Sequence, residues 1–423
     1  MSDPRPALAA QIRALVEQYF AHPEPHADEV RLPLHVPSFG ADEVNEAIEC
    51  LLSTRVTMGD KVRRFEALWA EYLGVAEAVM VNSGSSANLL AAAALVNPAF
   101  PRPLVAGDEV IVPAVAWSTT YFPLVNVGLV PVLVDVDLDT FTIDPAAAAR
   151  AVGPRTRALM PVHLLGNACD MRALGALAAR HDLVIVEDTC EAHGARFEGK
   201  MVGTFGAMGT FSFYFSHHIS TIEGGMLVTD DPALADLART LRAHGWTRDV
   251  KRKPKIVDAP IDERFLFVNL GYNFRPMETQ GAFGLHQVAK LEPFIKTRRD
   301  NVEYWNAALR RHGRWLRECP GRDTNGSRSV WFGYPISVRP GAPFSRDELV
   351  RFLEGKRIET RPIMAGNFRD QPAIGLFPHR IAGPLDNAEL VMRQSFFIGN
   401  HHAINERDRA YVVECVDEFM ARW

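Results

Sequence analysis

Two histidines, residue types suited to proton transfer near neutral pH, stand side by side at His217 and His218. They lie in the run Gly209–Met226, where a strand-like segment leads into hydroxyl and histidine residues and then into a Gly-Gly entry to a second strand. Adjacent histidines are also candidate metal ligands, but no nearby carboxylate or cysteine has metal-site spacing. This turn is therefore the first candidate for acid–base chemistry.

A small-residue turn follows an apolar segment at Val81–Asn88, and a helical pattern begins at about Ser86. Backbone N–H groups and hydroxyls in such a turn, together with a helix N-terminus, can hold a phosphate. Glycine and serine are also common as simple helix caps, so the turn alone leaves both interpretations open.

A buried strand at Val184–Val186 delivers Glu187 and Asp188 at its carboxyl end, the edge at which α/β sheets bind ligands. A carboxylate here could pair with a protonated ring nitrogen. The alternative is an aspartate that caps the next helix.

These segments belong to an alternation of short Val/Ile-rich runs and helical patterns, which predicts a mostly parallel sheet covered on both faces. The predicted strands are Ala78–Val81, Glu109–Val112, Val130–Val134, Ala158–Val162, Val184–Val186, Met208–Phe215 and Met226–Thr229, and the predicted helices include Ser86–Leu95, Asp170–Arg180 and Ala233–His244.

Three parts are expected along the chain: an N-terminal arm over residues 1–35, a large domain over 36–290, and a long helix with a smaller α+β domain over 291–423. The long helix should run from Met277 to about His312. Residues 247–268 are polar and include the basic run 251–255, which predicts either a solvated linker or contacts to substrate phosphates.

The composition argues against nucleic-acid-binding, membrane and secreted proteins. The 423 residues are 47% apolar and carry a formal net charge of −5, a poor balance for general binding to nucleic acid or anionic membranes. No apolar run has the roughly 18–20 residues of a membrane span, and no secretory signal is evident. The five cysteines lie far apart, which favours free thiols in a reducing cytoplasm.

Taken together in order and spacing, the three chemical segments resemble the StrS/DegT-like sugar aminotransferases, which depend on pyridoxal 5′-phosphate (PLP). The resemblance covers roughly residues 35–423. It implies the type I aspartate aminotransferase fold, with a large, mixed, mostly parallel sheet domain and a smaller α+β C-terminal domain. Further matching segments are Gly59-Asp60, Pro113–Trp117, Gly271–Pro276 and Ser395–Gly399.

The resemblance implies a cofactor site and a homodimer with shared active sites. The implied cofactor-binding residues are Gly84, Ser85 and Ser212 at the PLP phosphate, Trp117 stacked on the pyridine ring, Asp188 at the ring nitrogen, His193 near the ring, and Asn273 at the phosphate of the neighbouring subunit.

One departure from the aminotransferases matters most. Five residues after Ser212 they have the lysine that binds PLP covalently, whereas this chain has His217. Imidazole cannot hold PLP in that way, but it is a good acid and base. The swap, and the segment Glu359–Asn367, resemble the 3-dehydratases of 3,6-dideoxyhexose pathways, particularly those that act on GDP-4-keto-6-deoxymannose in colitose formation. We therefore expect His217 to be catalytic.

Four residues are expected at the substrate: His218, His244, Arg275 and Glu359. His218 would contact the sugar or orient its own loop, and His244 would enter the neighbour's site. For Arg275, a contact to the nucleotide diphosphate and an interface salt bridge both remain open.

Some of these dehydratases carry an iron–sulfur cluster on four cysteines and need a reductase. Cys190 matches the first cysteine position, but the loop between Trp246 and Leu270, which should supply the others, contains none. A cluster needs about four thiolates, so we expect no iron–sulfur cluster, no metal and no reductase partner.

The sequence thus predicts a 3-dehydratase that uses pyridoxamine 5′-phosphate (PMP) to remove the C3 hydroxyl of a nucleotide-linked 4-keto-6-deoxyhexose, with L-glutamate regenerating PMP from PLP. GDP is the favoured nucleotide, and CDP or dTDP remain open. An ordinary nucleotide-sugar aminotransferase and a non-catalytic regulatory or structural subunit with the same fold are also compatible with the sequence.

Overall fold

The computed structural model describes residues 3–22, 31–252, 261–319 and 327–423. Part of the basic run 251–255 therefore lies outside the described residues. Within the described chain, no helix is both long and apolar enough to cross a membrane.

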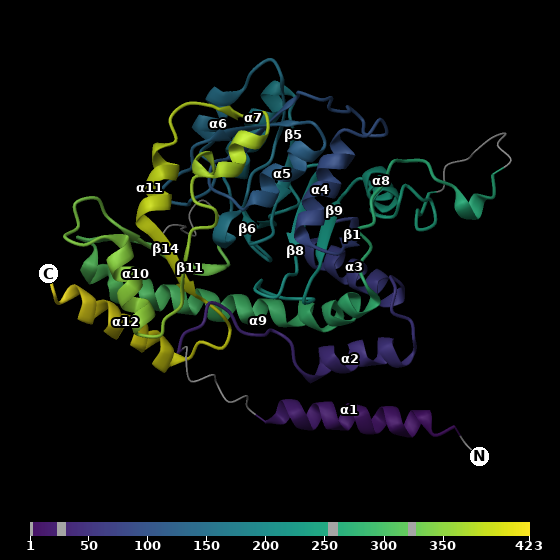
Figure 1. The fold of residues 1–423 in the computed structure, drawn as a ribbon, viewed down its shortest axis with the longest axis horizontal. Helices are drawn as coiled ribbons and strands as arrows, with labels where there is room; N and C mark the ends of the chain where they lie inside the picture. Colours follow the sequence, from purple (N-terminus) through teal and green to yellow (C-terminus); the bar gives the residue numbers. More distant parts are fainter. Residues whose placement is uncertain (1–2, 23–30, 253–260, 320–326) are drawn as a thin grey trace.

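A mixed sheet of eight strands forms the centre of the large domain (Figure 1). Five neighbouring pairs are parallel, and β9 pairs antiparallel with both β1 and β8. This confirms the predicted mostly parallel sheet. The spatial order is β1 (Glu77–Val81), β9 (Gly225–Thr229), β8 (Met208–Ser212), β5 (Val184–Asp188), β4 (Thr156–Leu159), β2 (Glu109–Pro113), β3 (Val130–Val134) and β13 (Arg380–Ile381).

Helices cover both faces of this sheet, because successive strand residues point to opposite sides. Val79 and Val81 join one core, whereas Ala78 and Met80 join the other. The first face packs against α4 (Gly84–Leu95), α5 (Ser118–Asn126), α8 (Pro232–Arg242) and α11 (Asp386–Gln394). The second packs against α3 (Asp60–Leu73), α6 (Pro145–Ala151), α7 (Met171–His181) and α9 (Glu278–Leu309).

The long helix α9 joins the large core to a smaller one. Its residues Leu291 and Ile295 pack under the large sheet, while Val302 and Trp305 pack under a second, antiparallel sheet. That sheet has the order β10 (Leu316–Arg317), β11 (Gly333–Val338), β14 (Ser395–Gly399) and β12 (Thr360–Pro362), and it is covered by α10 (Arg346–Gly355) and α12 (Glu406–Met420).

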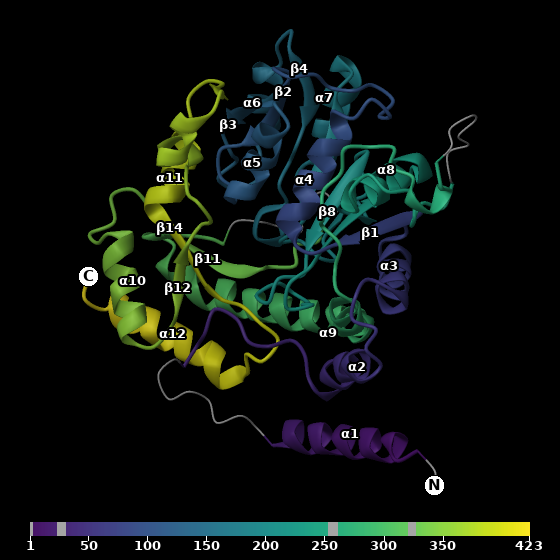
Figure 2. The ribbon, with the colours of Figure 1, turned by 45° about the vertical axis from the view of Figure 1, so that its right-hand side comes forward.

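The N-terminal arm includes the helix α1 (Arg5–Ala21), which lies beyond α2 (Ala41–Leu52) and away from the sheets in both views (Figures 1 and 2).

The C-terminal part of the chain also contributes to the large sheet. Strand β13 pairs in parallel with β3 and so places residues 380–381 on the edge of that sheet. The proposed division at residue 290 stays a prediction.

Several predicted elements differ from the structure at their ends, and each difference has a local cause. The strand expected to reach Phe215 stops at Ser212, the last residue that pairs with β9. In the small domain, β11 begins at Gly333, two residues after Trp331, which has a left-handed backbone (φ 53°). Helix α8 ends at Arg242, since His244 also has a positive φ of 63°.

A buried carboxylate fixes the start of α3. Glu278, the first residue of α9, accepts hydrogen bonds from the backbone N–H groups of Gly59 (2.6 Å) and Lys61 (2.7 Å). It thereby satisfies donors that a helix N-terminus leaves unpaired.

We expect Glu278→Gln to lower the free energy of unfolding by about 1–2 kcal/mol, because the amide replaces a charge-assisted acceptor with a weaker one. The shift of the urea unfolding midpoint measures it. Glu49→Gln, on the exposed side of α2, is the control and should cost less than about 0.5 kcal/mol. Equal stability of the two variants would contradict this role.

Candidate active site

The candidate site lies at the carboxyl edge of the large sheet. Asp188 ends β5 and Ser212 ends β8, while Gly84 opens α4 and Trp117 precedes α5. The parallel strands β5 and β8 are neighbours, so their carboxyl ends lie at one edge of the sheet. The fold thus brings together four segments that lie between residues 84 and 212 of the sequence.

Gly84 and Ser212 touch so closely that a side chain at Gly84 would not fit. A Cβ atom built on Gly84 would lie 2.4 Å from Ser212 Cβ and 2.8 Å from its Oγ. Beside them, Ser85 Oγ donates to Thr119 Oγ1 (3.1 Å). The start of α4 therefore combines a glycine, hydroxyl groups and helical N–H donors within one short stretch.

Asp188 is buried, and its orientation is fixed by neighbours. Its Oδ2 accepts hydrogen bonds from Asn88 Nδ2 (2.9 Å) and Thr120 Oγ1 (2.8 Å). Thr210 in turn donates from Oγ1 to Asn88 Oδ1 (2.6 Å). Sequence reasoning missed these positioning residues, although Asn88 closes the predicted phosphate turn.

Glu187, the other acid singled out from the sequence, points away from the site. It is fully buried and accepts hydrogen bonds from the backbone N–H groups of Gly203, Phe205 and Gly206 and from His163 Nε2. Adjacent residues of a strand point to opposite faces of the sheet. Asp188 therefore points to the candidate site, whereas Glu187 holds the loop over residues 203–206.

Three histidines form a cluster next to this edge. The His193 ring centroid lies 5.7 Å from that of His217 and 5.5 Å from that of His218. The His217 ring is also 5.3 Å from Phe332, and His217 Nδ1 has no hydrogen-bond partner among the described residues. The cluster is thus largely apolar in its surroundings.

Burial keeps the His217 imidazole uncharged. It lowers the pKa of His217 to about 3, and the nearby Arg298 guanidinium acts in the same direction. Burial likewise lowers the pKa of His193 and of His218. A group whose pKa lies below 7 is deprotonated at neutral pH, so His217 can accept a proton there.

Two of the expected substrate residues also hold protein segments. His218 is buried and its Nε2 donates to Val330 O (3.1 Å), a contact that agrees with the predicted loop-orienting role. The Glu359 carboxylate accepts from the backbone N–H of Leu34 (3.0 Å). Substrate contacts of His218 and Glu359 stay predictions.

His244, Asn273 and Arg275 are exposed. They lie on two paired backbone segments, residues 242–244 and 272–275, which together are called the platform. His244 N donates to Tyr272 O (2.6 Å), Phe274 N donates to Arg242 O (2.9 Å), and Arg275 Nε donates to Asn273 Oδ1 (3.0 Å). Their exposure leaves them available to a second molecule.

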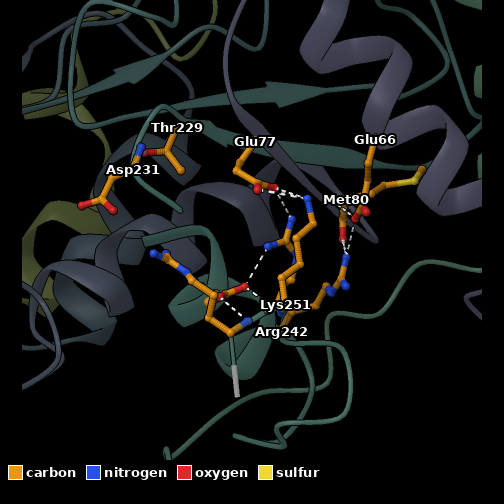
Figure 3. A network of polar contacts seen from close by, with 10 residues as sticks. Glu66, Glu77, Met80, Thr229, Asp231, Arg242 and Lys251 are labelled. Atoms are coloured by element: carbon orange, nitrogen blue, oxygen red, sulfur yellow. Dashed lines mark hydrogen bonds and ion pairs between the residues drawn. The ribbon is translucent and has the colours of Figure 1, made fainter. Parts of the chain in front are cut away.

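A buried ion network anchors that platform (Figure 3). Arg242 Nη1 donates to Glu66 Oε1 (2.7 Å) and to Met80 O (2.8 Å). Lys251 pairs with Glu77 (2.9 Å) at the edge of the same network, and Arg252 pairs with Asp236 (3.4 Å). These two cations of the basic run are therefore engaged in structural contacts.

Comparisons with known proteins agree with this architecture. The model of the DegT/DnrJ/EryC1/StrS aminotransferase family matches residues 37–417. This chain belongs to that family. A Yersinia pseudotuberculosis protein named GDP-4-keto-6-deoxy-D-mannose 3-dehydratase is 42% identical over 88% of this chain and 94% of its own length.

Two further relatives bear on the reaction. A Saccharopolyspora spinosa protein named dTDP-4-dehydro-2,6-dideoxy-D-glucose 3-dehydratase is 38% identical over 89% of this chain and 83% of its own. A crystal structure of GDP-4-keto-6-deoxymannose-3-dehydratase with a trapped PLP-glutamate geminal diamine has a TM-score of 0.86 and 39% identity, and the match covers 91% of this chain and 100% of that one. The chain has the fold of the type I PLP-dependent aminotransferases.

We expect Gly84→Ala to weaken PMP binding about tenfold or more, because the added methyl group must push Ser212 away from the start of α4. Titration of the apoprotein with PMP, followed by intrinsic fluorescence, measures the Kd. Gly175→Ala is the control, since nothing lies within 4 Å of the added methyl in α7. An unchanged Kd for Gly84→Ala would refute the importance of this close approach.

Proposed function

We propose that this chain is a PLP/PMP-dependent nucleotide-sugar 3-dehydratase, which removes the C3 hydroxyl of a nucleotide-linked 4-keto-6-deoxyhexose. The observation that carries the proposal is His217, in place of the family's lysine, within a cluster of neutral imidazoles. A lysine would bind the cofactor aldehyde and favour amine transfer. Histidine leaves the cofactor free to act as PMP.

The residues present fit a phosphate-bearing pyridine cofactor. Gly84, Ser85 and Ser212 would hold the phosphate, since the only side chain that fits at Gly84 is a hydrogen atom and hydroxyls flank it. Asp188 would pair with the ring nitrogen, and Trp117 and His193 would contact the ring. When bound, PMP supplies the amine for the C4 ketone and a ring that takes up electrons.

His217 carries the proton transfers in this proposal. As a neutral imidazole it accepts a proton from the carbon next to the cofactor amine, and it then gives that proton to the C3 oxygen as the hydroxyl leaves. The products are a 4-keto-3,6-dideoxyhexose, ammonia and PLP. L-Glutamate then returns the amino group, which restores PMP without a reductase.

GDP is the favoured nucleotide because the enzyme named for a GDP sugar is more similar than the one named for a dTDP sugar, at 42% against 38% identity. Arg275 and His244 would contact the nucleotide sugar. Both side chains are exposed, as a contact made across a subunit interface requires.

A homodimer with shared active sites completes the proposal. Asn273 is exposed and would reach the phosphate of the partner's cofactor. Exposed apolar side chains near this platform, including Leu270 at 95% exposure, Phe267 and Met277, would be covered by a second copy. All five cysteines are free thiols, which is compatible with a reducing cytoplasm.

We expect His217→Asn to lower the dehydration rate at least about a hundredfold, because asparagine matches imidazole in polarity but cannot carry a proton. Ammonia release and the mass of the 3-deoxy product measure the rate, with PMP, glutamate and a GDP-linked 4-keto-6-deoxyhexose supplied. His217→Lys should also lose dehydration and gain a borohydride-trapped lysine adduct. An amino sugar without ammonia from the wild type would make the chain an aminotransferase.

Shared sites predict complementation between two inactive variants. In a refolded equal mixture of His217→Asn and Asn273→Ala, heterodimers contain one intact site of two, so about a quarter of wild-type activity should return. Each variant alone is the control. No recovery from a mixture shown to contain heterodimers would place both residues in the same subunit's site.

A further inference from the structure

Arg298, in the middle of α9, is a buried cation near the histidine cluster. Its side chain is 3% exposed, and no carboxylate of the described residues lies within ion-pair distance of it. Its Nη1 instead donates to three backbone carbonyls, those of Trp331 (3.2 Å), Phe332 (3.0 Å) and Asn400. Buried charges are normally paired, so this one needs an explanation.

Two of the three carbonyls that Arg298 holds, those of Trp331 and Phe332, belong to the segment that packs on His217. Phe332 lies 5.3 Å from the His217 ring and 6.2 Å from the His218 ring. In the same segment, Val330 O accepts from His218 Nε2. Arg298 therefore holds the backbone of Phe332, and the Phe332 ring in turn contacts both imidazoles.

This segment is held in a conformation that its residues do not prefer. Trp331 has a φ of 53°, and so does Leu165, which faces it across a pair of backbone hydrogen bonds. Phe332 N donates to Leu165 O (2.9 Å) and Val330 N donates to Gly166 O (3.0 Å). Left-handed bulky residues persist only where the surroundings over-determine them, and Arg298 is the donor that fixes Trp331 and Phe332 from the α9 side.

The positive charge of Arg298 acts on the same ring. After burial, it is the second cause that lowers the pKa of His217, and it lowers the pKa of His193 and His218 in the same direction. The titratable groups that face His217 are His193, His218, Tyr214 and Arg298. None of these is a carboxylate that would offset the guanidinium.

We propose that Arg298 is a positioning residue for His217: its Nη1 holds the carbonyls of Trp331 and Phe332, which keeps the Phe332 ring against the imidazole and leaves an unpaired positive charge close by. The inference rests on His217 as the proton carrier proposed above. Once His217 has accepted a proton, the same charge makes the imidazolium a stronger acid. It therefore promotes delivery of the proton to the departing C3 oxygen.

The test separates geometry from charge with three variants of the PMP-loaded enzyme. Arg298→Lys keeps the charge but replaces the guanidinium whose Nη1 reaches the two carbonyls, and Arg298→Met removes both the charge and these hydrogen bonds. Phe332→Leu removes the ring contact alone. Arg299→Gln is the matched control, because Arg299 also lies on α9 and donates to a neighbouring carbonyl, that of Ser329 (3.0 Å). The readouts are histidine ¹⁵N chemical shifts against pH and the pH profile of dehydration.

Arg298→Met should raise the His217 titration midpoint by roughly one pH unit, with the acid limb of the rate profile moving up by the same amount. Arg298→Lys should keep the wild-type midpoint while its kcat falls about tenfold, and Phe332→Leu should behave likewise. Arg299→Gln should match the wild type in both readouts.

An unchanged His217 midpoint in folded Arg298→Met would overturn the inference, as would an Arg298→Lys midpoint that moves as far as that of Arg298→Met. The His217 titration midpoint is measured by ¹⁵N chemical shifts without substrate turnover. Failure of the proposed function appears separately, as a His217→Asn enzyme that still dehydrates the sugar.

Discussion

The buried carboxylate of Glu187 is the contact on which the candidate site depends. Four donors converge on it: the backbone N–H groups of Gly203, Phe205 and Gly206, and the His163 imidazole in the segment after β4. These hydrogen bonds fix the carboxyl end of β5. Asp188 on the opposite face can then be aimed by Asn88 and Thr120, and β8 follows as the next parallel strand with Ser212 at its end.

A site built on this edge separates two electrostatic regions. The phosphate turn and Asp188 are polar and rich in hydrogen bonds, whereas His193 and His217 lie among aromatic rings with Arg298 behind them. The polar region suits a charged cofactor. The apolar region keeps the His217 imidazole neutral, the form in which it can accept a proton. Histidine in place of lysine at position 217 is thus compatible with the aromatic surroundings of that side chain.

Much of the fold could be predicted because strand and helix periodicity are local signals. The sheet, the strand Val130–Val134 and the helix predicted over Asp170–Arg180 follow from such patterns. The association of Gly84 with Ser212 could not be derived from periodicity and came from the resemblance to a family. Arg298 and Phe332 were missed because their roles arise from contacts between α9 and a distant left-handed turn. The contact between the Glu359 carboxylate and Leu34 N was missed for the same reason, since a motif does not reveal a partner 325 positions away.

The proton that His217 is proposed to accept starts on the carbon that bears the cofactor amine. PMP with deuterium on that carbon, in a single turnover with the nucleotide sugar, follows this proton transfer. We expect the wild type to release deuterium to water in step with ammonia, whereas His217→Asn should retain it. Equal release by both enzymes would assign the proton transfer to a group other than His217.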